Sequence, residues 1–146
     1  MSFDNVLAAT NISSSGLAAE RLRMEVIANN IANAHSTRLP GGGVFRRHDV
    51  IFSAALKDKI GSGVPGTEKL GGVQVHEVVE DQSALPKIYE PGHPDAAEDG
   101  FVQMPNVFLP VEMVNLVTAS RAYEANLMVL QSFRQMSDQS LSLIRG

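Results

Sequence analysis

The strongest constraint on the fold is a series of residues spaced alternately three and four apart, from Phe3 to Ala34, most of them apolar. That spacing is typical of a coiled-coil seam and predicts a helix from Ser2 to about Ala34. A second series with the same spacing runs from Ala8 to Asn33 and lies nearly opposite the first on a helix. A solvent-facing helix has one apolar stripe, so two opposed stripes predict neighbours on both sides.

The C-terminal end carries a second helical pattern. Pro110 suits the first position of a helix, and Glu112 follows it where a negative charge favours the helix dipole. From there to about Ile144 the apolar residues form a sector of roughly 200°. We expect the two terminal helices to pair as a coiled-coil-like element. Because the sector is wider than one partner covers, apolar surface would remain for other subunits.

The segment between the helices, Ser36 to Leu109, has a different composition, rich in glycine and proline. Val73 to Val79 alternates like a strand, and Val44 to Phe52 is a second strand candidate. The glycine-rich run Gly61 to Gly72 between them indicates a flexible connection. Tyr89 to Gly100 is extended and turn-rich, because each proline biases its predecessor away from helix.

These patterns predict a mainly α, elongated fold with a small β-rich insert. Residues 1–35 and 110–146 would form one helical domain, and residues 36–109 a strand- and loop-rich insert. At 146 residues the chain suits a single domain or one elongated element.

Charge and composition exclude several classes of protein. The net charge of −4 disfavours nucleic acid and anionic membranes as partners, since both select clustered Lys and Arg. The absence of cysteine excludes disulfides and thiolate metal sites. No basic segment precedes an apolar run at the N-terminus, and no window approaches the ~18 apolar residues of a membrane span. On composition alone we expect a soluble cytoplasmic protein.

Residues that suggest chemistry are few. His93, Asp95 and Asp99 could be drawn as metal ligands, but no second histidine stands at ligand spacing. The glycine-rich "LPGGGVF" (Leu39 to Phe45) lacks the Lys-Ser/Thr of a phosphate-binding loop. We therefore predict no catalytic residue, metal, cofactor or small-molecule substrate. The alternative, a secreted hydrolase or metal-binding enzyme using the His93 region, needs a convergent site that the sequence does not reveal.

Longer stretches carry a family resemblance. "NNIAN" (Asn29 to Asn33) and "STRLPGGGVFRR" (Ser36 to Arg47) resemble the N-terminal signature of bacterial flagellar rod and hook proteins. "YEPGHPDAAEDGFVQMPNV" (Tyr89 to Val107) and "EMVNLVTASRAYEAN" (Glu112 to Asn126) are similar to a proximal-rod subunit of that family. The resemblance covers about two-thirds of the chain, in the family's order; Lys57 to Gly72 carries no such signature. The short insert also fits a proximal-rod subunit better than a hook or distal-rod protein.

The resemblance implies a structural axial protein, with terminal helices in an inner tube, an insert outside it and no catalysis. Its partners would be other copies, neighbouring rod proteins, the flagellar export apparatus and basal-body ring components. It would lie in the periplasm-spanning rod, exported by the type III apparatus without a cleaved signal peptide, which replaces the cytoplasmic expectation. Rod protein B is a same-class alternative, and a cytoplasmic coiled-coil adaptor is a non-flagellar one.

Three asparagines at the end of the first predicted helix, Asn29, Asn30 and Asn33, need an explanation, because asparagine is a mediocre helix former. We hypothesise that their amides bond neighbouring groups where subunits meet, as polar residues in a seam fix register. The alternative is C-terminal capping of the helix. The predicted subunit-interface residues are Phe3, Val6, Leu17, Leu22, Met24, Val26, Ile27, Asn29, Asn30, Ile31, Asn33, Met113, Leu116, Arg121, Tyr123, Glu124, Asn126, Leu127, Leu130 and Phe133.

Overall fold

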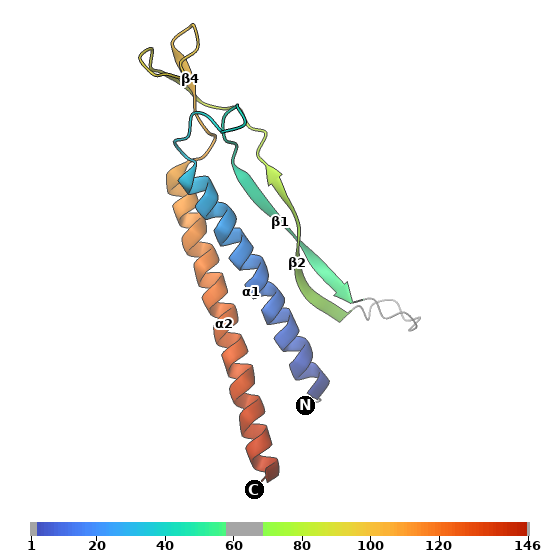
Figure 1. Cartoon of the computed structure of the whole chain (residues 1–146). Coiled ribbons are helices and arrows are strands. Elements are labelled where there is room, and N and C mark those ends of the chain that lie inside the picture. Colours follow the sequence, from blue (N-terminus) through green and yellow to red (C-terminus); the bar gives the residue numbers. More distant parts are fainter. Residues whose placement is uncertain (1–2, 58–68, 146) are drawn as a thin grey trace. The chain divides into compact units, whose positions relative to one another are not determined.

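The computed structural model describes residues 3–57 and 69–145. Along the chain, four strands lie between an N-terminal and a C-terminal helix (Figure 1). The elements are α1 (Phe3–Ala32), β1 (His48–Lys57), β2 (Lys69–Glu80), β3 (Lys87–Tyr89), β4 (Phe101–Gln103) and α2 (Leu109–Arg145). The described residues pack as two compact units, each with segments from both ends of the chain. Unit 1 lies within Met1–Leu22, Phe52–His76 and Ala119–Gly146, and unit 2 comprises Arg23–Ile51 and Glu77–Thr118.

The two predicted terminal helices are confirmed, and the fold is a mixture of helices and short antiparallel strands. Helix α1 ends at Ala32, slightly before the predicted Ala34, because a turn follows in which the N–H of Ser36 donates to the carbonyl of Asn33 (3.1 Å). Helix α2 starts at Leu109 with Glu112 in its first turn. In the part of the chain that the structure describes, neither helix is long and apolar enough to cross a bilayer. Pairing of the two helices as a coiled coil remains a prediction.

Strand β2 confirms the strand predicted from Val73 to Val79. The other strand candidate was wrong at its start, since β1 begins at His48 rather than at Val44. Gly42 and Gly43 adopt positive φ (84° and 81°) in a turn closed by the N–H of Leu39 and the carbonyl of Gly43 (2.9 Å). Only glycine adopts such backbone angles readily, so the chain straightens only after this turn.

The connection between β1 and β2 was predicted to stay flexible from Gly61 to Gly72. That prediction was wrong at its end, because Lys69–Gly72 belong to β2; residues 61–68 lie outside the described residues. Strands β1 and β2 pair as a two-stranded antiparallel sheet (Figure 1). A glycine inside a strand usually weakens it, but it also allows another part of the backbone to come close. Gly72 of β2 makes such a close approach.

In unit 1 the contact joins β2 to α1. Gly72 is buried with φ 113°, and a Cβ there would collide with the hydroxyl of Ser15. That hydroxyl accepts the N–H of Val73 (3.0 Å) and donates to the carbonyl of Ile12 (2.7 Å). Helix α2 also approaches α1 closely, because a Cβ at Gly16 would lie 3.2 Å from the side chain of Asn126. Small residues thus permit both close approaches within unit 1.

In unit 2 a hairpin was missed by the sequence prediction. Strands β3 and β4 pair antiparallel with Ile88 opposite Val102, and Val102 is buried. On the other face the rings of Tyr89 and Phe101 meet edge to face, with centroids 5.2 Å apart. Gly100 closes this hairpin with φ 75° beneath the Tyr89 ring, where a side chain would clash. Strands of three residues carry too little alternation to be recognised from sequence.

Candidate functional site

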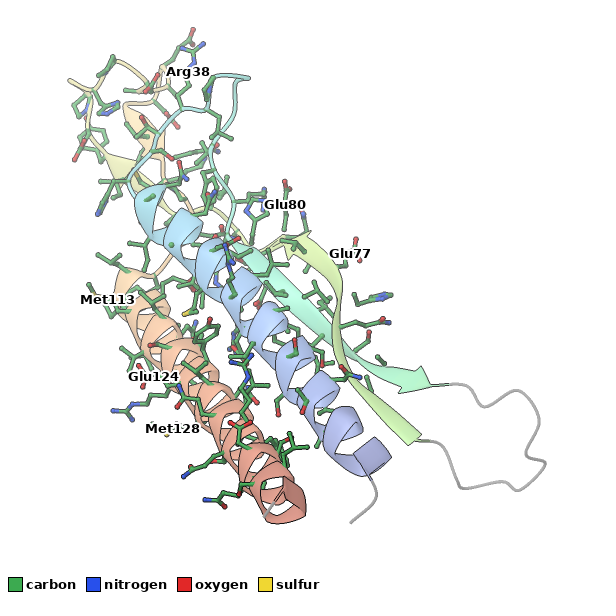
Figure 2. The ribbon with its side chains drawn as sticks, turned by 60° about the horizontal axis from the view of Figure 1, so that its bottom comes forward. Arg38, Glu77, Glu80, Met113, Glu124 and Met128 are labelled. Carbon is green, nitrogen blue, oxygen red and sulfur yellow. The ribbon has the colours of Figure 1, made fainter. Side chains whose placement is uncertain are left out.

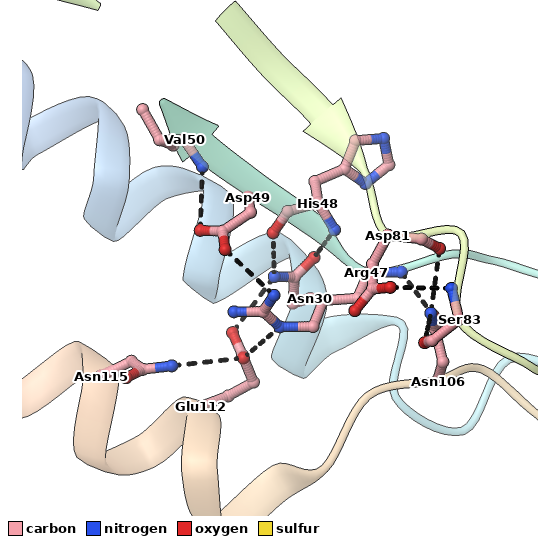
Figure 3. A network of polar contacts seen from close by, with 10 residues as sticks. All are labelled: Asn30, Arg47, His48, Asp49, Val50, Asp81, Ser83, Asn106, Glu112 and Asn115. Atoms are coloured by element: carbon pink, nitrogen blue, oxygen red, sulfur yellow. Dashed lines mark hydrogen bonds and ion pairs between the residues drawn. The ribbon is translucent and has the colours of Figure 1, made fainter. Parts of the chain in front are cut away.

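A polar junction in unit 2 consists of Asn30, Arg47, His48, Asn106 and Glu112 (Figure 3). Asn30 is fully buried near the end of α1. Its side-chain oxygen accepts the N–H of His48 (2.9 Å), and its nitrogen donates to the carbonyl of His48 (2.8 Å) and to Glu112 (3.1 Å). One amide therefore fixes the first residue of β1 and reaches the first turn of α2.

Glu112 supplies the charge of the polar junction. Its side chain is only 1% exposed, and the Nε of Arg47 donates to its Oε1 at 2.8 Å. The amide of Asn115 lies 3.5 Å from the same oxygen. A buried carboxylate is costly without such partners, and its place in the first helical turn adds the favourable field of the helix dipole.

Arg47 is held between two carboxylates. Burial lowers the pKa of Arg47, but the hydrogen bond and charge of Glu112, together with Asp49, outweigh it and raise the pKa. The carboxylate of Asp49 lies 3.2 Å from Nη1. The guanidinium therefore stays charged, and its positive charge is balanced within the junction.

Asn106 closes the polar junction on the other side of Arg47. Its oxygen accepts the N–H of Arg47 (2.8 Å), while its nitrogen donates to the carbonyl of Asp81 (3.0 Å) and to the hydroxyl of Ser83 (2.8 Å). The N–H of Asp81 donates in turn to the carbonyl of Arg47 (2.7 Å). The junction thus ties the ends of α1 and β2 to the starts of β1 and α2.

The three asparagines singled out in the sequence have different roles within the chain. Asn30 belongs to the polar junction, so its hydrogen bonds are made inside the subunit. The side chain of Asn33 donates to the carbonyl of Asn29 (3.0 Å) and to its side-chain oxygen (2.9 Å), a local arrangement at the helix end. An additional role at a subunit interface stays a prediction for all three asparagines.

Sequence reasoning missed Arg47, Asn106 and Glu112 as members of a site. The available signal was a lone carboxylate, Glu112, between Val111 and Met113 in an apolar stretch of a predicted helix. Such a residue is buried only with a partner, but nothing in the spacing identifies that partner 65 residues earlier.

The predicted interface residues differ in burial. The buried ones are Ile27 and Asn30. The half-buried ones are Leu17, Leu22, Met24, Val26, Ile31, Asn33, Leu116, Tyr123, Asn126, Leu130 and Phe133. The exposed ones are Asn29, Met113, Arg121, Glu124 and Leu127. The side chains of Phe3 and Val6 lie outside the described ones.

The second apolar stripe of α1 has partners in its own chain. In unit 1 Ser15 contacts Gly72 of β2. In unit 2 Val26 lines a cavity together with His48 of β1 and Val78 of β2. The opposed stripes predicted neighbours on both sides of the helix, and for part of the second stripe that neighbour is the β1–β2 pair.

Helix α2 has an apolar surface that the described residues of the chain leave exposed. We call Val111, Met113, Val114 and Val117 the outer face of α2. These side chains are 49–65% exposed, whereas Glu112 on the opposite side of the helix is buried. Figure 2 shows Met113 pointing away from α1. Phe108, which precedes the helix, is 67% exposed. A contiguous apolar patch of this kind indicates an interaction surface.

The residues considered for metal binding brace turns. The N–H of Asp95 donates to Nδ1 of His93 (3.1 Å), and Asp95 accepts the hydroxyl of Thr37 (2.8 Å). Asp99 accepts the N–H of Phe101 (3.2 Å). Within residues 3–57 and 69–145 no three His, Cys, Asp or Glu side chains are grouped to hold a metal ion.

Comparison with known proteins gives the family. Residues 11–38 match the model of the flagella basal body rod protein, and residues 98–143 match that of the flagellar basal body rod FlgEFG protein C-terminal. The chain is 39% identical to the flagellar basal-body rod protein FlgC of Borreliella burgdorferi, over 97% of this chain and 99% of that one. The chain belongs to the FlgC family of flagellar basal-body rod proteins.

Other FlgC relatives are similar over most of their length. The FlgC of Salmonella typhimurium is 41% identical over 91% of this chain and 93% of its own. The FlgC of Bacillus subtilis is 37% identical over 91% and 94%. The two matched segments contain Asn30 and Glu112, so the polar junction joins the two parts recognised by the family models.

Proposed function

We propose that the chain is a structural subunit of the proximal flagellar rod that assembles through the apolar surfaces of its terminal helices. Membership of the FlgC family supports the rod role. The observation that carries the assembly role is the outer face of α2, where four large apolar side chains lie in solvent. Covering them contributes roughly 25 cal/mol per Å² of apolar surface, so a second molecule is favoured there.

The polar junction supports a mechanical role. A rod subunit that transmits torque must resist shear between its helices and its insert. In unit 2, Asn30, Arg47 and Glu112 connect α1, β1 and α2 through a buried ion pair and short hydrogen bonds. Breaking such a pair leaves a buried charge without its partner, which resists opening.

The location follows from this role. The subunit would lie in the basal body, in contact with neighbouring rod proteins and basal-body ring components. Delivery by the flagellar type III export apparatus without a cleaved signal peptide completes the proposal.

The test is a charge on the outer face. Val114→Glu places a carboxylate on a surface that the free subunit exposes to water, so helix content by circular dichroism should be unchanged. At an assembled interface the same charge would be desolvated, so we expect swimming to be lost and rods to be absent from isolated basal bodies.

The matched control is Gln135→Glu, an exposed polar position on the same helix, which should swim normally. Export is followed separately by detecting the subunit outside the cytoplasm. A Val114→Glu strain with normal rods and normal swimming would show that the outer face is not an assembly surface.

A further inference from the structure

Unit 2 contains a pocket that is separate from the polar junction and from the outer face of α2. It lies beside β4 and has a volume of about 320 Å³ (Figure 1). That volume is at the lower limit for small-molecule sites. The lining comes from the loop after α1, from the β3–β4 hairpin and from the turn that joins these two strands. We call it the hairpin pocket.

One face of the hairpin forms part of the lining. Lys87 pairs with Gln103 and Tyr89 with Phe101, so these four side chains lie on the same face, because alternate residues of a strand share a face. Three of them, Lys87, Phe101 and Gln103, line the hairpin pocket. The edge-to-face contact with Tyr89 holds the ring of Phe101 in place.

The other parts of the lining are fixed by hydrogen bonds. The loop after α1 contributes Thr37 and Val44, and the turn contributes Asp95 and Asp99. The hydroxyl of Thr37 donates to Oδ2 of Asp95 at 2.8 Å and ties the loop to the turn. Oδ1 of Asp99 accepts the N–H of Phe101 (3.2 Å) and holds the turn to β4. The hairpin pocket is therefore organised before a ligand arrives, which lowers the cost of binding.

Several polar groups in the hairpin pocket have bonding capacity left. Within the described residues, the exposed side chains of Lys87 and Gln103 have no hydrogen-bond or ion-pair partner. Asp99 uses Oδ1 for the N–H of Phe101 and keeps its second oxygen. The pocket thus offers an ammonium that donates, an amide that donates and accepts, and a carboxylate oxygen that accepts.

The charges of the lining limit the class of ligand. Asp95 and Asp99 are opposed by Lys87, and by Arg38, which lies 3.7 Å from Asp95. Two carboxylates disfavour a phosphate or another strong anion. A divalent cation would meet the ammonium, and the described residues supply no group of three acidic, histidine or cysteine ligands. A purely apolar molecule would cover the polar groups without bonding them, which is costly.

We propose that the hairpin pocket binds a saccharide, as a ligand on which no chemical step is performed. Each sugar hydroxyl both donates and accepts, which matches the ammonium, the amide and the carboxylate oxygen. The C–H groups on the faces of a sugar ring suit the apolar side chains of Phe101 and Val44. All of the lining comes from one chain, so the binding requires no assembled rod.

Tyrosine fluorescence provides a direct test, because the chain has two tyrosines and no tryptophan. In the full chain carrying Tyr123→Phe, Tyr89 is the single remaining tyrosine, and its ring contacts Phe101 of the hairpin pocket. The probes are glucose, N-acetylglucosamine and the linear trimer of N-acetylglucosamine. At least one of them should change the emission of Tyr89 saturably, with half-saturation near about 1 mM, as expected for a ligand of this size.

Gln103→Ala and Lys87→Ala each remove one polar group of the hairpin pocket. Both side chains are exposed, so the circular dichroism spectrum should be unchanged. Each substitution should raise the half-saturating concentration by about 3–10-fold, the effect of one lost hydrogen bond. Gln82→Ala is the matched control, since Gln82 is exposed in the same unit but does not line the pocket, and it should bind normally.

The source of the saccharide is distinguished by a second assay, co-sedimentation with insoluble cell-wall glycan. Binding to that polymer alone, weakened by Gln103→Ala, would support the proposal and identify a polymeric ligand. Binding to the soluble sugars, weakened in the same way, would support a free ligand.

Three outcomes would overturn the proposal. The first is the absence of saturable binding to the sugars and to the glycan. The second is an equal effect of Gln82→Ala and Gln103→Ala. The third is loss of rods in the Lys87→Ala, Gln103→Ala double variant without any saccharide binding, which would make the hairpin pocket a protein contact. Val114→Glu should leave saccharide binding unchanged, so failure of the rod proposal is measured separately.

Discussion

Asn30 makes three hydrogen bonds with a single amide, and no other neutral side chain of similar size offers one acceptor and two donors in that geometry. It holds both backbone groups of His48 and donates to Glu112. Asparagine is a poor choice inside a helix on propensity alone. Here its tertiary bonds outweigh that local cost, which explains its presence near the end of α1.

Glu112 is the residue whose loss should affect unit 2 most. Glu112→Ala removes the partner of Arg47 and leaves the amide of Asn30 with an unmade bond. We expect a loss of roughly 3 kcal/mol in the free energy of unfolding, the lower end for a broken buried pair, since Arg47 can still reach water. Urea denaturation measures it. Glu124→Ala, exposed on the same helix, should change stability by less than about 0.5 kcal/mol. Equal effects of the two substitutions would remove the junction's structural role.

Asp81 should give the chain an acid-dependent contribution to stability. Hydrogen bonds from the backbone and side chain of Ser83 lower the pKa of Asp81 below its ordinary value. The folded state therefore favours the charged form. The stabilisation is complete above the ordinary aspartate pKa and is lost as the pH falls through the lowered value. Asp81→Asn should flatten this part of the pH profile, measured by urea denaturation between about pH 2 and 6. An unchanged profile would contradict it.

At the scale of elements, the close approach of β2 to α1 depends on Gly72. Gly72→Ala introduces a Cβ into the hydroxyl of Ser15 and a side chain at φ 113°. We expect a loss of about 1–3 kcal/mol in the free energy of unfolding, from the strained backbone and the displaced hydrogen bond.

Gly41→Ala is the matched control, because a Cβ there meets nothing within 4 Å. Alanine also restricts the unfolded chain, so that variant should be neutral or slightly more stable. Denaturation midpoints of the two variants give the comparison. If Gly72→Ala unfolds at the same midpoint as Gly41→Ala, the contact between β2 and α1 does not stabilise unit 1.

The helices could be predicted from sequence because their patterns are long and periodic. Both terminal helices and the core of β2 were found in this way. The β3–β4 hairpin and the start of β1 were not, since they depend on single glycines such as Gly100 and Gly43 and on a few residues of strand. The two opposed stripes of α1 predicted neighbours on both sides, but periodicity cannot tell whether a neighbour is a second subunit or the chain's own β1–β2 pair.

The candidate site was accessible only in part. Asn30 drew attention with Asn29 and Asn33 because asparagine opposes helix propensity, but the predicted role was at a subunit interface, and its hydrogen bonds within the chain were not predicted. Arg47 and Asn106 lie 17 and 76 residues further along, and no local pattern relates them to Asn30. Long-range polar contacts are decided by the tertiary path of the chain, which a single sequence does not specify.

At the scale of the whole molecule, we expect the purified chain to associate as its concentration rises. The outer face of α2 contains no ionisable side chain, so the association should persist at high salt, where charge-driven contacts between exposed groups weaken. Sedimentation velocity at about 0.05 M and about 1 M salt measures this association, because the Debye length shortens several-fold between these concentrations. Association that disappears at 1 M salt would point to a charged surface instead. Val114→Glu should reduce the association at both concentrations.

The polar junction also has a consequence in time. Asn30 and Glu112 are 82 residues apart, and a ribosome delivers the first long before the second. Until the last third of the chain emerges, Asn30 and Arg47 lack the carboxylate of Glu112, and the N–H of Arg47 lacks the side chain of Asn106. The polar junction can therefore form completely only after Glu112 has been synthesised.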